Sequence, residues 1–322
     1  MVSQPTATDP KIRQELYAKR CKDLNTHLLS GRDRHLAEGI DINDSFIDGD
    51  PLRADSYRVP IRSYVPALHT GGGNGIVGKD IVIYYHGGGI YVGDLDSEDI
   101  TCRRICKELG CTVYSVDYRL MPKFTADDAF NDAMQAFRGI TKVEKARRLV
   151  VMGSSSGGQL AAMVSQEHRL QPQPLLPGST RHEIKIHGVV LRGPVTCDAT
   201  NGGVTIPVRF RKFHTSMSPA FYTSLFGSAA VTAENRVTGL MPLEGDLSNL
   251  PRHWIQVSTN DVYYSDGVLY AEALKEAGVE VKLDVVVGYP HTFWLKAPEL
   301  NRAIQAEHDM IAGLKWVLQS GV

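Results

Sequence analysis

The sequence has little that would attract a polyanion or a membrane. Its 35 Lys and Arg residues nearly balance 36 Asp and Glu residues, so the formal net charge is −1. A chain with so small a net charge has no large field of one sign to gather nucleic acid or anionic lipid. Neither a membrane-length apolar run nor a secretory signal is recognisable. The sequence therefore predicts no nucleic-acid partner, no membrane span and a cytoplasmic location.

Cysteines are also few, and their spacing matches no zinc site. The five are Cys21, Cys102, Cys106, Cys111 and Cys197. An odd number of thiols is typical of a protein from a reducing compartment, so we expect buried or half-exposed free cysteines. No cluster of ligand-type residues suggests a metal or a cofactor, and we predict neither.

Short apolar runs alternate with stretches of helical periodicity through most of the chain. The runs are Ile81–Tyr85, Thr112–Val116, Leu149–Met152, Ile186–Leu191, Trp254–Val257 and Val281–Val287. Nearly continuous apolar character is typical of parallel strands that are buried on both faces. The alternation predicts an α/β fold with a mostly parallel, doubly wound sheet and helices on both faces. We expect residues 1–322 to form one domain.

Two regions interrupt this alternation, at approximately residues 1–50 and 198–240. The first looks helical and partly polar, whereas the second is irregular and rich in proline and aromatic residues. Insertions between sheet units usually cover the mouth of a site. We therefore predict a helical lid over the C-terminal edge of the sheet, and this surface is also a candidate for homodimer formation.

A serine motif, Gly153-Ser154-Ser155-Ser156-Gly157, lies between the apolar run Leu149–Met152 and the helix-like stretch Gln159–Arg169. A G-x-S-x-G sequence between a strand and a helix forms a nucleophile elbow. The turn is tight, so the residues that flank its serine must be small. Only Ser155 has glycine both two residues before and two residues after it. We predict Ser155 as the nucleophile.

A glycine-rich segment, His86-Gly87-Gly88-Gly89, follows the run Ile81–Tyr85. Glycine amides with no side chain in the way can donate hydrogen bonds to the oxyanion of a tetrahedral intermediate. We predict that the amides of Gly88, Gly89 and Ser156 form the oxyanion hole. His86 is expected to order this loop rather than to transfer a proton.

An acid and a histidine must follow the nucleophile in that order. Asp261 comes after the run Trp254–Val257, and His291 comes after Val281–Val287. Both would lie at the C-terminal ends of their strands, where open α/β sheets bind ligands. Asp266 is a competing candidate for the acid. We predict a triad of Ser155, Asp261 and His291.

From about Asp80 to the C-terminus, the chain resembles the hormone-sensitive-lipase-like branch of the α/β hydrolases. Five segments carry this resemblance, and they match the family's HGGG segment, its DYRLAP, its lead into the acid strand, its DPLRDE and its PHGF. In this chain they are His86–Leu95, Asp117–Pro122, Asp246–Pro251, Asp261–Asp266 and Pro290–Phe293. The resemblance implies the α/β-hydrolase fold and ester hydrolysis, and it supports Asp261 over Asp266.

The chain departs from the family pattern at three positions. Ser154 stands where the elbow motif GDSAGG has Asp, Ser156 stands where it has Ala, and Lys123 replaces an acidic residue after DYRLAP. None of these changes removes a triad member, but the hydrogen bonds beside the nucleophile must differ. Tyr91, Ser154 and Trp294 are candidate pocket residues.

These observations predict a serine carboxylic-ester hydrolase that works through an acyl-enzyme. The resemblance implies small-molecule substrates, either short- to medium-chain esters or small specialised ones. An acyltransferase or a lactone- or ring-forming enzyme would use the same triad, so that alternative stays open. Amide hydrolysis is a further alternative, as is a ligand-binding module on the same fold.

Overall fold

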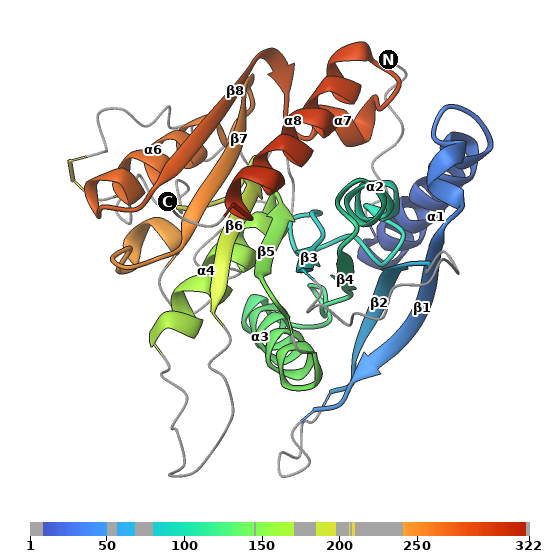
Figure 1. Cartoon of the computed structure of the whole chain (residues 1–322), viewed down its shortest axis with the longest axis horizontal. Helices are drawn as coiled ribbons and strands as arrows, with labels where there is room; N and C mark the ends of the chain where they lie inside the picture. Colours follow the sequence, from blue (N-terminus) through green and yellow to red (C-terminus); the bar gives the residue numbers. More distant parts are fainter. Residues whose placement is uncertain are drawn as a thin grey trace.

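The computed structural model describes residues 9–49, 57–67, 80–144, 146–170, 185–197, 206, 208–209 and 241–319. Within these residues, eight strands form one sheet in the order β1-β2-β4-β3-β5-β6-β7-β8 (Figure 1). The strands are β1 (Ile40–Ile47), β2 (Val59–Pro66), β3 (Ile81–Tyr85), β4 (Thr112–Val116), β5 (Leu149–Ser154), β6 (Ile186–Arg192), β7 (Arg252–Asn260) and β8 (Val281–Pro290). Strand β2 is antiparallel to both β1 and β4, and the other pairs are parallel. The mostly parallel sheet confirms the predicted fold class.

All six predicted apolar runs are strands of this sheet, but the first two strands were not predicted. The helical reading of residues 1–50 holds for α1 (Pro10–Ser30) and is wrong for β1. Strand β1 lies at the edge of the sheet, so its Asp, Asn and Ser side chains can face solvent while its backbone pairs with β2. A strand of this polarity has no continuous apolar run by which it could be recognised.

Helices cover both faces of the sheet (Figure 1). They are α2 (Asp99–Leu109), α3 (Ala126–Val143), α4 (Ser156–Leu170), α6 (Tyr264–Glu276), α7 (Phe293–Lys296) and α8 (Asn301–Val317), with short 3₁₀ turns at η1 (Arg34–Ala37) and η4 (Pro242–Glu244). Apolar side chains of α3, α4 and α6 pack in one cluster with one side of the strands, and those of α2 and α8 pack in a second cluster with the other side.

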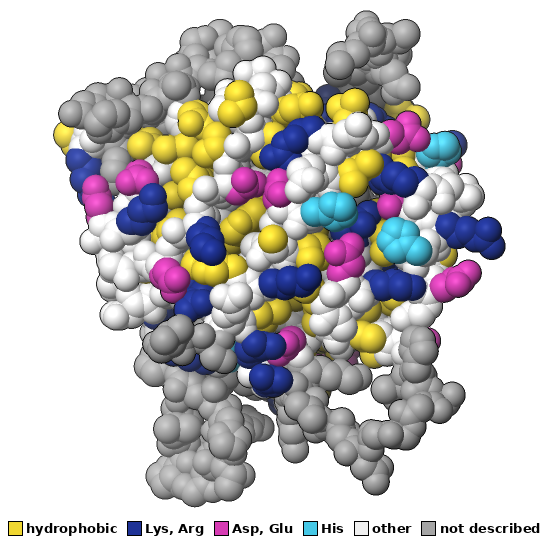
Figure 2. Space-filling view, turned by 45° about the horizontal axis from the view of Figure 1, so that its top comes forward, with side chains coloured by type: hydrophobic (Ala, Val, Ile, Leu, Met, Phe, Trp, Pro, Cys, Tyr) yellow, Lys and Arg dark blue, Asp and Glu magenta, His cyan; other side chains and the backbone are white. Residues whose placement is uncertain are grey.

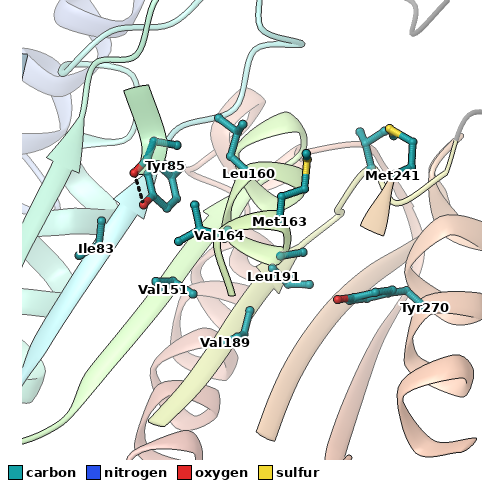
Figure 3. Close-up of a cluster of buried hydrophobic side chains, with 14 of the residues drawn as sticks. Ile83, Tyr85, Val151, Leu160, Met163, Val164, Val189, Leu191, Met241 and Tyr270 are labelled. Atoms are coloured by element: carbon teal, nitrogen blue, oxygen red, sulfur yellow. Dashed lines mark hydrogen bonds between the residues drawn. The ribbon is translucent and has the colours of Figure 1, made fainter. Parts of the chain in front are cut away.

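Alternating side chains of the central strands supply both clusters. In β3, Ile83 and Tyr85 point towards α3 and α4, whereas Tyr84 points towards α2 and α8. Figure 3 shows Tyr85 close to Leu160 and Val164 of α4, the helix that follows the predicted nucleophile. This packing fixes α4, and with it the turn between β5 and α4, against the centre of the sheet.

Helix α1 lies against the loop that follows β3. The side-chain amide of Gln14 donates hydrogen bonds to the carbonyl oxygens of Tyr91 (2.9 Å) and Met121 (3.1 Å). Asn25, about three turns further along α1, donates to the carbonyl oxygen of Asp96 (2.7 Å). The first predicted lid segment therefore contacts the HGGG loop. Of the second, residues 198–240, all except 206, 208 and 209 lie outside the described residues.

The surface carries lysine, arginine and acidic side chains intermingled, as Figure 2 shows for one face. All five cysteines are free and buried, which agrees with the sequence-based expectation. In the described part of the chain, no helix combines the length and the apolar character needed to cross a membrane.

Candidate active site

The turn between β5 and α4 holds Ser155 in a strained conformation. Its φ is +52°, in the left-handed region that L-residues other than glycine rarely adopt. A β-carbon at Gly153 would lie 2.2 Å from the carbonyl oxygen of Gly157, and one at Gly157 would lie 2.0 Å from that of Tyr85. Neither position can hold a larger residue. These close approaches are the physical reason for the two glycines of the motif.

The side chains of Ser155, His291 and Asp261 lie in one hydrogen-bonded row. The Oγ atom of Ser155 is 2.8 Å from Nε2 of His291, and Nδ1 of His291 is 2.7 Å from Oδ2 of Asp261. The other carboxyl oxygen of Asp261 accepts the amide of Tyr263 at 2.8 Å. All three side chains are largely buried. The structure thus brings together the three residues predicted as the triad.

The competing acid, Asp266, lies elsewhere. Its Oδ2 atom accepts hydrogen bonds from the backbone amides of Thr196 (2.9 Å) and Cys197 (3.2 Å). The side-chain hydroxyl of Thr196 in turn donates to the carbonyl oxygen of Asp266. Asp266 therefore anchors the chain segment after β6, and Asp261 is the carboxylate at His291.

The loop after β3 reaches the serine turn through backbone conformations that favour glycine. Gly88 has φ +130° and Gly89 has φ +67°, and a β-carbon at Gly88 would lie 1.9 Å from the carbonyl oxygen of Val92. The amide of Ile90 donates to Oγ of Ser156 (3.3 Å), so the serine that replaces the family's alanine ties this loop to α4. Because Ser156 is the first residue of α4, its own amide has no partner within the helix.

His86 is fully buried beneath this loop. Its ring stacks on Tyr118 at a centroid distance of 4.3 Å, and Nδ1 lies 2.8 Å from the carbonyl oxygen of Gly87. The hydroxyl of Tyr118 donates to the carbonyl oxygen of His86 at 2.6 Å. Burial lowers the pKa of His86, which keeps the ring neutral. These contacts favour a loop-ordering role over proton transfer.

The three candidate pocket residues have different environments. Tyr91 is half-buried, at the point where Gln14 of α1 contacts the loop. Trp294 is 3% exposed and lies under the guanidinium of Arg192, with 4.0 Å between that group and the ring centroid. Trp294 also lines a cavity of about 120 Å³ between α1, α2 and the segment after His291.

The third candidate, Ser154, has a different environment. Its side chain is fully buried, and its hydroxyl donates a hydrogen bond to the carboxyl group of Glu98, at the start of α2. Its hydroxyl is therefore directed at the start of α2. The β5 strand direction explains this placement, because successive side chains of a strand point to opposite faces.

Three residues near the triad were not predicted from the sequence. Gly193 (φ +53°) lies so close that a β-carbon there would be 3.2 Å from Oδ2 of Asp261. Arg192 is fully buried and its carbonyl oxygen accepts the amide of Ser155 at 2.8 Å. Glu98 is 4% exposed. None of the three belongs to a sequence motif, and only the glycine's position just after a predicted strand could have drawn attention to it.

Comparison with known proteins identifies the family. A profile of the alpha/beta hydrolase fold matches residues 82–295, more than half of the chain. The chain belongs to this family. The match confirms the resemblance to hormone-sensitive-lipase-like esterases that the motifs indicate. It runs from β3 to α7 and so includes the HGGG loop, the serine turn, Asp261 and His291.

Named relatives of this α/β hydrolase include esterases. It is 29% identical over 267 residues to an ethyl acetate hydrolase of Pseudomonas putida, covering 80% of this chain and 78% of that one. Its fold matches that of a hyperthermophilic esterase from Pyrobaculum calidifontis with a TM-score of 0.71 and 25% identity, covering 97% and 95% of the two chains. These similarities support the ester-hydrolase function that the motifs predict.

A third relative is much longer than this chain. The hydrolase is 30% identical over 269 residues to a protein of Aspergillus terreus named FAD-linked oxidoreductase pytB. The alignment covers 80% of this chain but 31% of that protein. The chain thus spans less than a third of that relative's length.

Proposed function

We propose that the chain is a serine carboxylesterase that cleaves small esters through an acyl-enzyme. The observation that carries the proposal is the row of hydrogen bonds from Ser155 through His291 to Asp261, with both distances below 3 Å. A serine hydroxyl is a weak nucleophile unless a positioned base accepts its proton. In this row, Nε2 of His291 is the base and Asp261 holds the ring in the tautomer that leaves Nε2 free to accept.

In the proposed reaction, Ser155 Oγ attacks the ester carbonyl carbon while its proton moves to His291 Nε2. The tetrahedral oxyanion accepts hydrogen bonds from the amides of Gly88, Gly89 and Ser156, each contributing about 3 kcal/mol to the transition state. His291 then returns the proton to the leaving alkoxide as the carbonyl reforms. A water molecule, deprotonated by the same ring, attacks the acyl-enzyme, and Ser155 leaves with the proton.

The substrate class that we propose is an ester with a short acyl group. The Pseudomonas putida relative is named for the hydrolysis of ethyl acetate, and it aligns over most of both chains. The resemblance to the hormone-sensitive-lipase-like branch points the same way. A single domain with α1 as one part of a lid, a homodimer and a cytoplasmic location remain further predictions.

The decisive experiment compares wild type with Ser155→Ala on p-nitrophenyl acetate, butyrate and octanoate. We expect the wild type to prefer the acetate or butyrate, and the variant to lose at least about a thousandfold in kcat. A serine-reactive phosphonate should label the wild type at Ser155 and leave the variant unlabelled. A folded wild type that neither turns over these esters nor reacts with the phosphonate would overturn the proposal.

A competing alcohol separates hydrolysis from acyl transfer, since the same triad supports both. We expect the free acid to remain the main product at low alcohol concentration. If transfer to the alcohol dominates under those conditions, the enzyme is an acyltransferase whose preferred acyl acceptor is not water.

A further inference from the structure

The carboxyl group of Glu98 joins the two segments that hold the reacting groups. Its Oε1 atom accepts the backbone amide of Gly87 at 2.8 Å and also the hydroxyl of Ser154, and its Oε2 atom accepts the hydroxyl of Tyr84. Gly87 directly precedes the proposed oxyanion donor Gly88, and Ser154 directly precedes Ser155. One oxygen atom therefore fixes the distance between the HGGG loop and the serine turn.

The two segments approach so closely at this point that a side chain on Gly87 would press on its neighbours. A β-carbon at Gly87 would lie 3.1 Å from both the carbonyl oxygen and Oγ of Ser154, and 3.4 Å from Cβ of Ser155. The bonds to Glu98 keep the two segments from moving apart, and a shared acceptor also sets their relative orientation.

The side chain of Glu98 is directed towards the site and does not cap its own helix. It is the N-cap residue of α2, where a side chain usually accepts an amide of the first turn, yet it makes no such bond. Instead its carboxyl group is buried among three donors. Burial raises the pKa of Glu98, while the hydrogen bonds from Ser154, Tyr84 and Gly87 and the charge of Arg192 act against this rise.

The position of this carboxyl group accounts for the departure from the family motif at Ser154. Related elbows have an aspartate there, whereas this chain has a hydroxyl. Because Ser154 Oγ already lies beside Gly87, a carboxylate on residue 154 would reach the same region from the other side. We propose that Glu98 is a positioning residue that supplies, from the start of α2, the carboxyl group that the elbow lacks, and so holds the oxyanion donors in register with Ser155.

This inference rests on the proposed esterase function, and it predicts an effect on kcat rather than on KM. The oxyanion forms only in the transition state, so a displaced donor weakens transition-state binding and leaves ground-state binding nearly intact. In Glu98→Gln, the amide nitrogen would take the place of one carboxyl oxygen, so it would face either the hydroxyl of Tyr84 or the amide of Gly87 together with the hydroxyl of Ser154. We expect kcat for p-nitrophenyl acetate to fall about tenfold or more while KM stays within about twofold.

The matched control is Glu144→Gln. Glu144 also accepts a tyrosine hydroxyl, that of Tyr114, at 2.6 Å, but it lies at the end of α3 and contacts neither the HGGG loop nor the serine turn in the described structure. We expect its kcat to equal that of wild type. If Glu98→Gln and Glu144→Gln have the same kcat as a wild type that is active, the inference is wrong although the esterase function stands.

An exchange of the carboxyl group between the two positions gives the sharper test. Ser154→Asp alone places two carboxyl groups within contact, and we expect kcat to fall about a hundredfold because like charges oppose each other there. Combining Ser154→Asp with Glu98→Gln restores one carboxyl group and one partner that can donate to it. We expect the double variant to recover to within about tenfold of wild type, a strong coupling between the two sites.

Unfolding midpoints of all variants are measured beside the kinetics, so that lost activity is compared among folded proteins. A double variant whose loss equals the product of the two single losses would overturn the inference. Should Ser154→Asp not fold, the comparison of Glu98→Gln with Glu144→Gln decides alone, since a tenfold loss in kcat confined to the former supports the inference and equal values refute it.

Discussion

Gly193 lies against the carboxylate of Asp261. A β-carbon at this glycine would be 3.2 Å from Oδ2, the oxygen that contacts His291, and 3.4 Å from two atoms of the imidazole ring. The backbone of Gly193 has φ +53°, and its amide donates to the carbonyl oxygen of Gln256 at 2.7 Å. The end of β6 thus forms one wall of the space that the acid and the base occupy.

Gly193→Ala should impair catalysis as well as folding. The left-handed conformation costs an L-residue about 1–2 kcal/mol. In addition, the methyl group displaces Asp261 and His291 by a few tenths of an ångström. We expect kcat to fall about tenfold or more, because catalysis depends steeply on the position of the base. Steady-state kinetics with p-nitrophenyl acetate and thermal unfolding measure the two effects separately.

Gly278→Ala is the control for backbone strain alone. Gly278 has φ +81°, and a β-carbon there would meet nothing within 4 Å. We expect a comparable loss of stability with unchanged kcat. Equal kcat in the two variants would show that the contact between Gly193 and Asp261 is unimportant for the reaction.

A second prediction separates the two aspartates. Asp261→Asn should lower kcat by about 10²–10⁴-fold, because an amide can hold the imidazole in the wrong tautomer and does not stabilise its charged form. Asp266→Asn disturbs two amide hydrogen bonds in a buried site and should lower stability by about 1–3 kcal/mol, with kcat within a few-fold of wild type. Kinetics and denaturant unfolding of both variants test this contrast, and a reversed order would reassign the acid.

The sequence alone predicted the parts of this site that obey strict local rules. The elbow needs glycine at positions 153 and 157 because any β-carbon there would overlap a backbone oxygen. The HGGG loop likewise needs Gly88 in a conformation with φ +130°. Such constraints act within a few residues of the chain, so they leave a readable motif.

The parts that sequence reasoning missed depend on contacts between distant segments. Glu98 meets Ser154 across 56 positions of the chain, and no periodicity or spacing relates the two. Strand β1 was missed for a different reason. It is an edge strand that pairs with β2 through its backbone, and its polar side chains give no apolar pattern by which a strand is recognised. A strand that is buried on both faces can be recognised by its continuous apolar sequence, whereas no residue of β1 is fully buried.

A third prediction concerns the buried pair of Arg192 and Glu307. Arg192 is fully buried, with Nη1 at 2.5 Å from a carboxyl oxygen of Glu307 and Nε at 2.9 Å from the side-chain oxygen of Gln256. Arg192→Met would remove the shorter of the two ion pairs of the largely buried Glu307, which would keep Arg104 at 3.7 Å and the hydroxyl of Thr101 at 3.2 Å. We expect a loss of about 3–5 kcal/mol in the free energy of unfolding, measured by urea denaturation.

The control for that variant is Arg302→Met. Arg302 pairs with Asp309 at 2.9 Å, but both side chains are about a quarter exposed. A pair that water can reach contributes about 1 kcal/mol or less. If the two substitutions lower the free energy of unfolding equally, burial does not make the pair of Arg192 and Glu307 more important for stability than the partly exposed pair.

The last prediction concerns the pH dependence of stability and rests on His253. This ring is fully buried, Nδ1 donates to the carbonyl oxygen of Pro251 at 2.7 Å, and Nε2 has no hydrogen-bond partner among the described residues. Burial lowers the pKa of His253 to about 4. The unfolded chain, whose histidines titrate near their ordinary pKa, therefore binds more protons than the folded chain between about pH 4 and pH 6.5.

The free energy of unfolding must consequently fall as the pH falls through this window. Integrating the proton uptake of this one group gives a loss of about 2 kcal/mol between pH 8 and pH 5. His253→Phe keeps an aromatic ring beside Tyr270, removes the titrating group and should flatten the curve by that amount, whatever its effect on stability at pH 8. His35→Gln, at an exposed histidine, should leave the slope unchanged. Urea denaturation at both pH values measures each slope, and a His253→Phe slope equal to that of wild type would mean that His253 is not the group responsible.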